Sequence, residues 1–105
     1  MAKSILQSQK ECFVCRRWYN VKTVRGLEEH HVLTGPLRSF AEQQGLKVWL
    51  CHRHHNQPGF SAHFDPALAQ QLKCYAQQRF EETYTSGVPA HTVWMLHTGK
   101  DYTHS

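Results

Sequence analysis

The chain has 105 residues, of which 40% are hydrophobic and 19% charged, and these proportions exclude an intrinsically disordered protein. A chain of this length supports one hydrophobic core, so we expect a single domain over residues 11–105. The formal net charge of +4 favours an anionic partner, and nucleic acid is expected. No apolar run approaches the roughly 18 residues of a membrane span, and no secretory signal is visible, so a cytoplasmic protein without a membrane partner is expected.

In chain order, residues 1–10 are polar and are expected to be flexible. Order is expected to begin at Glu11–Arg17 (ECFVCRR), a tight Cys-x-x-Cys knuckle. Leu27–Thr34 (LEEHHVLT) and Lys47–Cys51 (KVWLC) are β-compatible runs bounded by glycines, and they are predicted to pair as a hairpin. Between them, Leu37–Gln44 has apolar residues at helical spacing, which predicts two helical turns that the next glycine stops.

The run Cys51–Asn56 (CHRHHN) is expected to begin a helix that a Pro-Gly pair breaks early. A longer helix is predicted to be capped by Asp65 and to run through residues 66–84. One face of this helix is apolar and is expected to pack on the core; it carries Leu68, Leu72, Tyr75, Ala76 and Phe80. The final segment, residues 85–105, contains the apolar stretch Val93–Leu96, which is expected to add a last helical turn or two.

Four residues have the spacing of a structural zinc site. Cys12 and Cys15 form a Cys-x-x-Cys pair, and Cys51 and His54 form a Cys-x-x-His pair, with 35 residues between the two pairs. Each pair supplies two ligands on one turn, as a closed tetrahedral Zn²⁺ site requires. The alternative is that the thiols are small buried apolar groups and the histidine lies on the surface. Cys74 has no partner spaced near it and is interpreted as a core residue.

A second group consists of histidines: the adjacent pair His30 and His31 on the first strand, with His55 and His63 downstream. Neighbouring residues of a strand point to opposite faces, so the adjacent pair is expected to have two different roles. One of the two suits a metal ligand and the other a general base, because an imidazole titrates near pH 6.5. The alternative is a solvated histidine pair beside two glutamates.

The segments LEEHHVLTG, GLKVWLC, HRHHN and AHF, in this order, resemble the HNH endonucleases, also called His-Me finger or ββα-metal nucleases, and within them the small phage and prophage members. The resemblance covers roughly residues 11–84, and GKDY at Gly99–Tyr102 is similar to the tail of the same group. It implies an α+β fold: a ββα-metal finger with a zinc knuckle over about 11–64, a packing helix over 66–84, and a C-terminal extension over 85–105. It also implies a phage or prophage protein inside a bacterial host.

The same resemblance implies roles for the histidines. His31 would be the general base, and a catalytic divalent ion (Mg²⁺, Mn²⁺, Ni²⁺ or Zn²⁺) would be held by His30, His55 and His63. The last two are eight residues apart, so the loop between them must fold back; otherwise Asn56 or water completes the ligand set. Leu46 stands where the family has its asparagine. The Nδ1 of the base must then be oriented by another group, such as a backbone carbonyl.

The function that follows is a metal-dependent endonuclease that hydrolyses phosphodiester bonds of DNA. Five basic residues are candidates for phosphate contacts: Arg16, Arg17, Arg25, Arg38 and Lys47. The alternative is a zinc-stabilised nucleic-acid-binding module that keeps the HNH scaffold without cleavage. A purely structural zinc adaptor is a third possibility, but it leaves the histidine pair unexplained.

Overall fold

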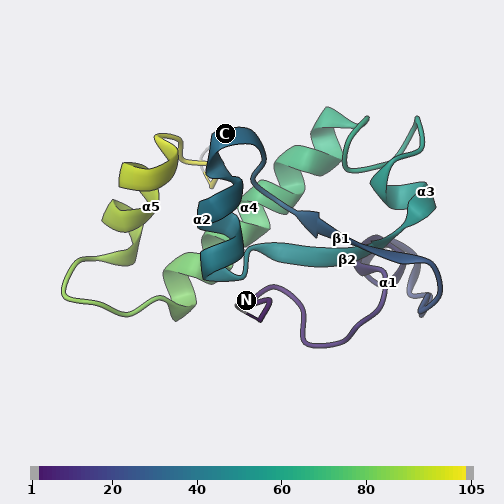
Figure 1. Ribbon diagram of the computed structural model, residues 1–105, viewed down its shortest axis with the longest axis horizontal. Coiled ribbons are helices and arrows are strands. Elements are labelled where there is room, and N and C mark those ends of the chain that lie inside the picture. Colours follow the sequence, from purple (N-terminus) through teal and green to yellow (C-terminus); the bar gives the residue numbers. More distant parts are fainter. Residues whose placement is uncertain (1–2, 104–105) are drawn as a thin grey trace.

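The computed structural model describes residues 3–103 as a small α+β fold, in which α-helices surround a two-stranded antiparallel sheet (Figure 1). The described elements are α1 (Phe13–Tyr19), β1 (Leu27–His31), a 3-10 turn η1 (Gly35–Leu37), α2 (Arg38–Gln44), β2 (Lys47–Cys51), α3 (His52–His55), α4 (Pro66–Thr83) and α5 (Ala90–Thr98). This confirms the predicted α+β class. Within the described residues, no helix combines the length and hydropathy that a membrane span requires.

The sheet is the hairpin predicted from the sequence. Leu27 pairs with Cys51 at one end, and His31 pairs with Lys47 at the other. The first strand ends at His31, three residues earlier than predicted, because the next two side chains are both buried. Consecutive residues of a strand face opposite sides, so burying both requires the backbone to leave the strand. Figure 1 shows α1 and α3 near the end of the sheet where β2 finishes, and α2 near the other end.

The N-terminal segment was expected to be flexible over residues 1–10. It packs on the core at Ile5 and Leu6, whereas residues 8–10 are exposed, and residues 3–10 form no helix or strand. Leu6 is buried, and the backbone N–H of Ile5 donates to the carbonyl of Gly45 at 3.0 Å. Gly45 has a φ of +71°, and a Cβ there would lie 2.1 Å from a carbonyl oxygen of this segment. Glycine is therefore required where the segment crosses the turn after α2. The first two residues of the chain lie outside the described part.

Helix α1 was not predicted, because only the Cys-x-x-Cys knuckle was recognised there. The helix is capped at its start by the Cys12 sulfur, which accepts from the N–H of Cys15 at 3.4 Å. It ends at Asn20, which has a left-handed backbone with a φ of +52°. Asparagine tolerates this conformation better than most residues, so it serves as the stop signal. The helix places two cysteines on one turn, facing the core.

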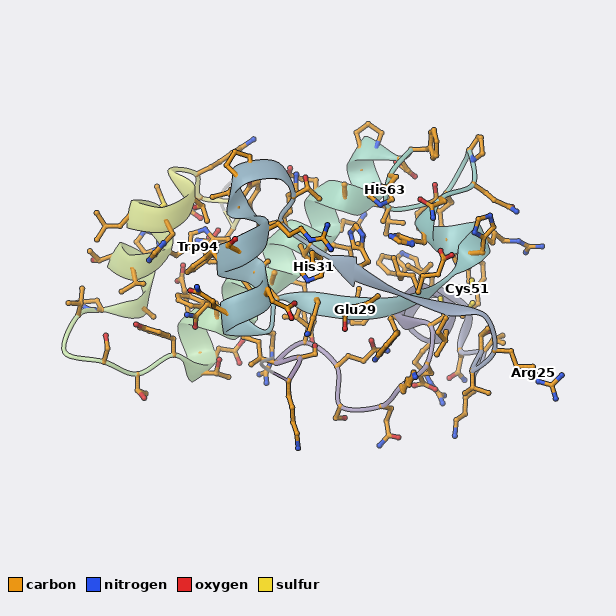
Figure 2. The ribbon with its side chains drawn as sticks, viewed as in Figure 1. Arg25, Glu29, His31, Cys51, His63 and Trp94 are labelled. Atoms are coloured by element: carbon orange, nitrogen blue, oxygen red, sulfur yellow. The ribbon has the colours of Figure 1, made fainter. Side chains whose placement is uncertain are left out.

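Helices α4 and α5 pack on each other and complete the core. Asp65 caps α4 by accepting from two backbone N–H groups, and α4 coincides with the helix predicted from this cap and the following proline. Helix α5 is longer than the predicted turn or two and packs on α4 through Trp94, which has no exposed surface. Figure 2 shows Trp94 pointing inward, and its indole N–H donates to the Lys100 carbonyl at 2.9 Å.

A surface contact between α5 and α4 makes stability depend on pH. His91 donates from Nδ1 to a Glu81 oxygen at 2.9 Å, and this hydrogen bond raises the pKa of His91. A raised folded-state pKa contributes stability that is fully present below about pH 6.5 and is lost as the pH rises through the folded value. We therefore expect wild type to lose a small part of its free energy of unfolding between about pH 6 and pH 8, a loss absent from His91→Gln. Urea unfolding at several pH values measures it, and parallel curves for the two proteins would contradict it.

Candidate metal centres

Three cysteines and one histidine converge at one end of the sheet. Cys12 and Cys15 come from the start of α1, Cys51 is the last residue of β2, and His54 lies on α3. The Nδ1 atom of His54 lies 3.6, 3.4 and 3.3 Å from the sulfurs of Cys12, Cys15 and Cys51, respectively. The four candidate zinc ligands predicted from their spacing thus form one cluster.

The size of this cluster fits a tetrahedral ion. With Zn–S bonds of about 2.3 Å and Zn–N bonds of about 2.0–2.1 Å, the sulfur and nitrogen ligands stand about 3.6 Å apart, and two sulfurs about 3.8 Å apart. The sulfur–nitrogen separations here are 3.3–3.6 Å, and the Cys15 and Cys51 sulfurs are 3.9 Å apart. The cluster can therefore hold a metal ion such as zinc.

The electrostatics of the cluster favour a cation. Burial raises the pKa of the Cys12 thiol to about 12, so a thiolate at this place needs a positive charge beside it. Burial also lowers the pKa of His54, which favours the neutral imidazole that binds metal. Cys74, the remaining cysteine, lies half-buried on α4 and is not a member of the cluster.

Three further histidines form a second cluster beside the first. His30 lies on β1, His55 on α3 next to His54, and His63 in the loop after α3. The candidate ligand nitrogens of the three rings lie within 4.8 Å of one another, and the Nε2 atoms of His55 and His63 are 3.1 Å apart. Imidazoles that share one ion at about 2.1 Å would have nitrogens about 3.0–3.4 Å apart. The geometry is compatible with a shared ion.

The loop between His55 and His63 folds back, as this cluster requires. The backbone N–H of His63 donates to the carbonyl of His55 at 3.3 Å, and that of Ala62 donates to the carbonyl of His54 at 2.8 Å. Gly59, with a φ of +108°, makes the reversal possible. The eight-residue spacing therefore brings the two imidazoles together rather than separating them.

Glu28 holds one of these imidazoles in place. Its carboxylate accepts from Nδ1 of His55 at 2.8 Å and from the Asn56 amide at 3.2 Å. The hydrogen bond from His55 is the main reason that the pKa of Glu28 is lowered. Since an ionised carboxylate only accepts, Nδ1 of His55 carries a hydrogen, and Nε2 is the nitrogen that faces the cluster. Asn56, considered above as a substitute ligand, contacts this carboxylate instead.

Two imidazoles of this cluster, His30 and His63, favour the neutral form that binds a metal ion. Burial, together with the charges of His55 and His63, lowers the pKa of His30 to about 3. Burial lowers the pKa of His63 as well, with a smaller contribution from His55. At neutral pH these two rings have lone pairs available to a metal ion.

His31 does not join this cluster. It faces α2, on the other side of β1 from its neighbour, and its Nε2 atom lies 2.6 Å from an oxygen of Glu42. A hollow of about 600 Å³ opens at this place, lined by Glu29, His31, Gly35, Arg38, Ser39, Glu42 and Gln43. In Figure 2, His31 and Glu29 lie along β1, apart from the loop that carries His63. The orienting contact is made at Nε2 by a carboxylate, not at Nδ1 by a backbone carbonyl as expected.

The candidate phosphate-binding residues have different surroundings. Arg38 lines the hollow beside His31, and Arg25 projects away from the fold in Figure 2. Arg16 pairs with Glu11 at 3.0 Å. The guanidinium of Arg17 lies over the ring of Tyr75, at 5.1 Å from its centroid. Lys47 departs most from the predicted phosphate contact, because it is buried and its ammonium contacts two carboxylates.

For two glutamates that contact the candidate histidines, the sequence predicted no such contact. Glu28 could have been found, because it stands two residues before His30 and so shares a face of the strand with it. Glu42 gave no such signal, since it comes from a different element, eleven residues from His31.

Comparison with known proteins returned nothing similar: no family model matches the chain, and no curated protein or solved structure shows significant similarity to it. The resemblance to HNH endonucleases therefore stays a prediction that rests on residues of this chain.

Proposed function

We propose that this protein is a metal-dependent phosphodiesterase acting on DNA. More specifically, we propose an HNH-type endonuclease with a ββα-metal core. The observation that carries the proposal is the cluster of three imidazoles from β1, α3 and the following loop, one of them oriented by Glu28. It lies beside a cysteine-rich cluster of the kind that holds a structural ion. A closed structural site uses four protein ligands, whereas a set of three leaves a coordination position open to water or substrate.

Different residues of the site would have separate roles in the proposed reaction. His30, His55 and His63 would hold a divalent ion, which when bound would neutralise charge growing on the phosphate and on the leaving oxygen. His31 would take the proton from the attacking water. Arg38 lines the same hollow as His31, which suits a contact with a phosphate oxygen.

A second candidate is a zinc-stabilised module that binds nucleic acid without cutting it. One observation favours it. The side chains of His30 and His31 point to opposite faces of β1, so the proposed base faces away from the other imidazoles. Cleavage would then require a scissile phosphate that contacts the three-histidine cluster on one face of β1 and His31 on the other. The strand ends at His31, so the phosphate would have to bind at this end.

Ion content and plasmid nicking test the proposal together. We expect wild type to hold two ions per chain, one tight zinc and one exchangeable ion, and to nick plasmid DNA with Mg²⁺, Mn²⁺ or Ni²⁺. His63→Ala removes one imidazole from the exposed side of the cluster and is expected to lose the exchangeable ion and the nicking together.

His91→Gln, on the distant helix α5, is the matched control and should keep both. DNA binding without nicking by wild type would favour the module. Nicking by His63→Ala at the wild-type rate would contradict the proposed ligand set.

A further inference from the structure

We propose that Glu42 is a positioning residue for His31, holding its Nε2 atom so that Nδ1 is the nitrogen left to accept a proton. This inference rests on the proposed function for its catalytic meaning, but the arrangement of the ring can be tested by itself. The proposed orienting group differs from the expected one, which was a backbone carbonyl in place of the missing asparagine. The contact that supports it is the 2.6 Å separation between His31 Nε2 and Glu42 Oε2.

The position of the hydrogen follows from the charge of the carboxylate. The hydrogen bond from His31 is the main reason that the pKa of Glu42 is lowered, and Lys47 lowers it further. An ionised carboxylate has no hydrogen to donate, so the short contact requires a hydrogen on Nε2. A neutral imidazole carries one hydrogen, and its lone pair is therefore on Nδ1.

The carboxylate is itself held in place. The ammonium of Lys47 lies 3.3 Å from the same Glu42 oxygen and 3.5 Å from Glu29, and the Lys47 side chain is 7% exposed. Glu29 reaches His31 at a longer distance of 3.9 Å. With Arg38 lining the same hollow, these are the charged groups around the ring among the described residues.

A metal ion at this place is a less favourable interpretation. Ligand atoms of Glu29, His31 and Glu42 do lie within 4.8 Å of one another. However, the buried ammonium of Lys47 already contacts both carboxylates, and a divalent cation beside it would meet strong like-charge repulsion. Positioning of the imidazole uses the contacts that are present.

The placement of Glu42 depends on how α2 packs. Phe40 and Ala41 are buried and fix the helix against the core, and α2 contacts β1. Glu42 follows them on the helix and keeps 28% of its side-chain surface exposed, at the edge of the hollow. Because α2 is fixed against the core, the Glu42 carboxylate has little freedom to move, as a group that orients another side chain requires.

The first test measures the ring and needs no activity. In long-range 1H–15N spectra at about pH 8, where an ordinary imidazole is neutral, we expect His31 of the zinc-loaded protein to carry its hydrogen on Nε2. His31→Ala assigns the signal by its absence. In Glu42→Ala the Nδ1–H form should become populated, whereas Glu42→Gln, which can still accept at its amide oxygen, should keep more of the Nε2–H form.

The second test measures cleavage with the exchangeable ion in excess. We expect kcat to fall about 10–100-fold in Glu42→Ala, and less in Glu42→Gln, with unchanged KM and ion content. Glu29→Gln is the matched control, because it removes a carboxylate that contacts Lys47 but not the short bond to His31; it should remain close to wild type.

The outcomes separate the two proposals. If wild type does not cleave DNA but the spectra behave as described, the nuclease proposal fails and the positioning of the ring stands. If His31 has the same hydrogen position in wild type and Glu42→Ala, Glu42 does not position it. An equal loss of kcat in Glu29→Gln would also overturn the inference, since a general charge effect would then explain both. If Glu42→Ala does not fold, Glu42→Gln and Glu29→Gln still allow the comparison.

Discussion

Cys51→Ser is expected to abolish the folded state of the protein, and so is removal of the ion by a strong chelator. The cysteine–histidine cluster joins α1, β2 and α3. Structural zinc contributes about 10–16 kcal/mol of apparent binding free energy in small peptides, and a whole domain is stable by about 5–15 kcal/mol. Loss of one thiolate ligand therefore removes a contribution comparable to the total. Circular dichroism and urea unfolding, with zinc content measured on the same samples, would record it.

Cys74→Ser is the matched control, since it changes the same atom in the cysteine outside the cluster. We expect it to keep one tight zinc and to unfold near the wild-type urea concentration. His54→Cys should also retain zinc, because four thiolates form an equally closed tetrahedral site. If Cys51→Ser bound no zinc and unfolded at the wild-type midpoint, the cluster would have no structural role.

The parts of the site that could be predicted from the sequence are those encoded by short spacings. Cys12 and Cys15 can bind one ion together, because only two residues separate them and Cys12 caps the first turn of the helix that contains Cys15. Helix α4 was predicted for a similar reason, since its cap and its apolar face are local patterns. Such signals need no knowledge of the rest of the fold.

Contacts between distant elements were beyond this kind of reasoning. Lys47 was expected to contact phosphate, but the pairing of β2 with β1 brings its side chain beside Glu29, and α2 brings Glu42 to the same place. A charged residue is usually predicted to be exposed, because most charged side chains lie on the surface. Whether its charge is already neutralised depends on its neighbours in the folded protein. The same packing supplies the partner of His31, for which the sequence offered no candidate side chain.

His31→Ala is expected to lower kcat for DNA cleavage by about 10²–10⁴-fold, which corresponds to about 3–5 kcal/mol of transition-state stabilisation. Ion content should not change, since His31 belongs to neither the cysteine–histidine cluster nor the cluster of three histidines. KM for DNA should also stay close to wild type, because a proton transfer contributes to the transition state and not to binding. Initial rates of plasmid nicking across DNA concentrations, with bound ions counted, measure all three quantities.

This variant decides between the enzyme and the binding module more sharply than a ligand variant does. Loss of an imidazole at His63 would remove both an ion and any stabilisation that the ion provides, so a lost activity has two explanations. His31 contacts Glu42 and belongs to neither cluster, so its substitution leaves both clusters intact. A selective loss of kcat in His31→Ala therefore has a single explanation. If His31→Ala nicks DNA at the wild-type rate with the same ions bound, the proton must go elsewhere and the proposed general base is wrong.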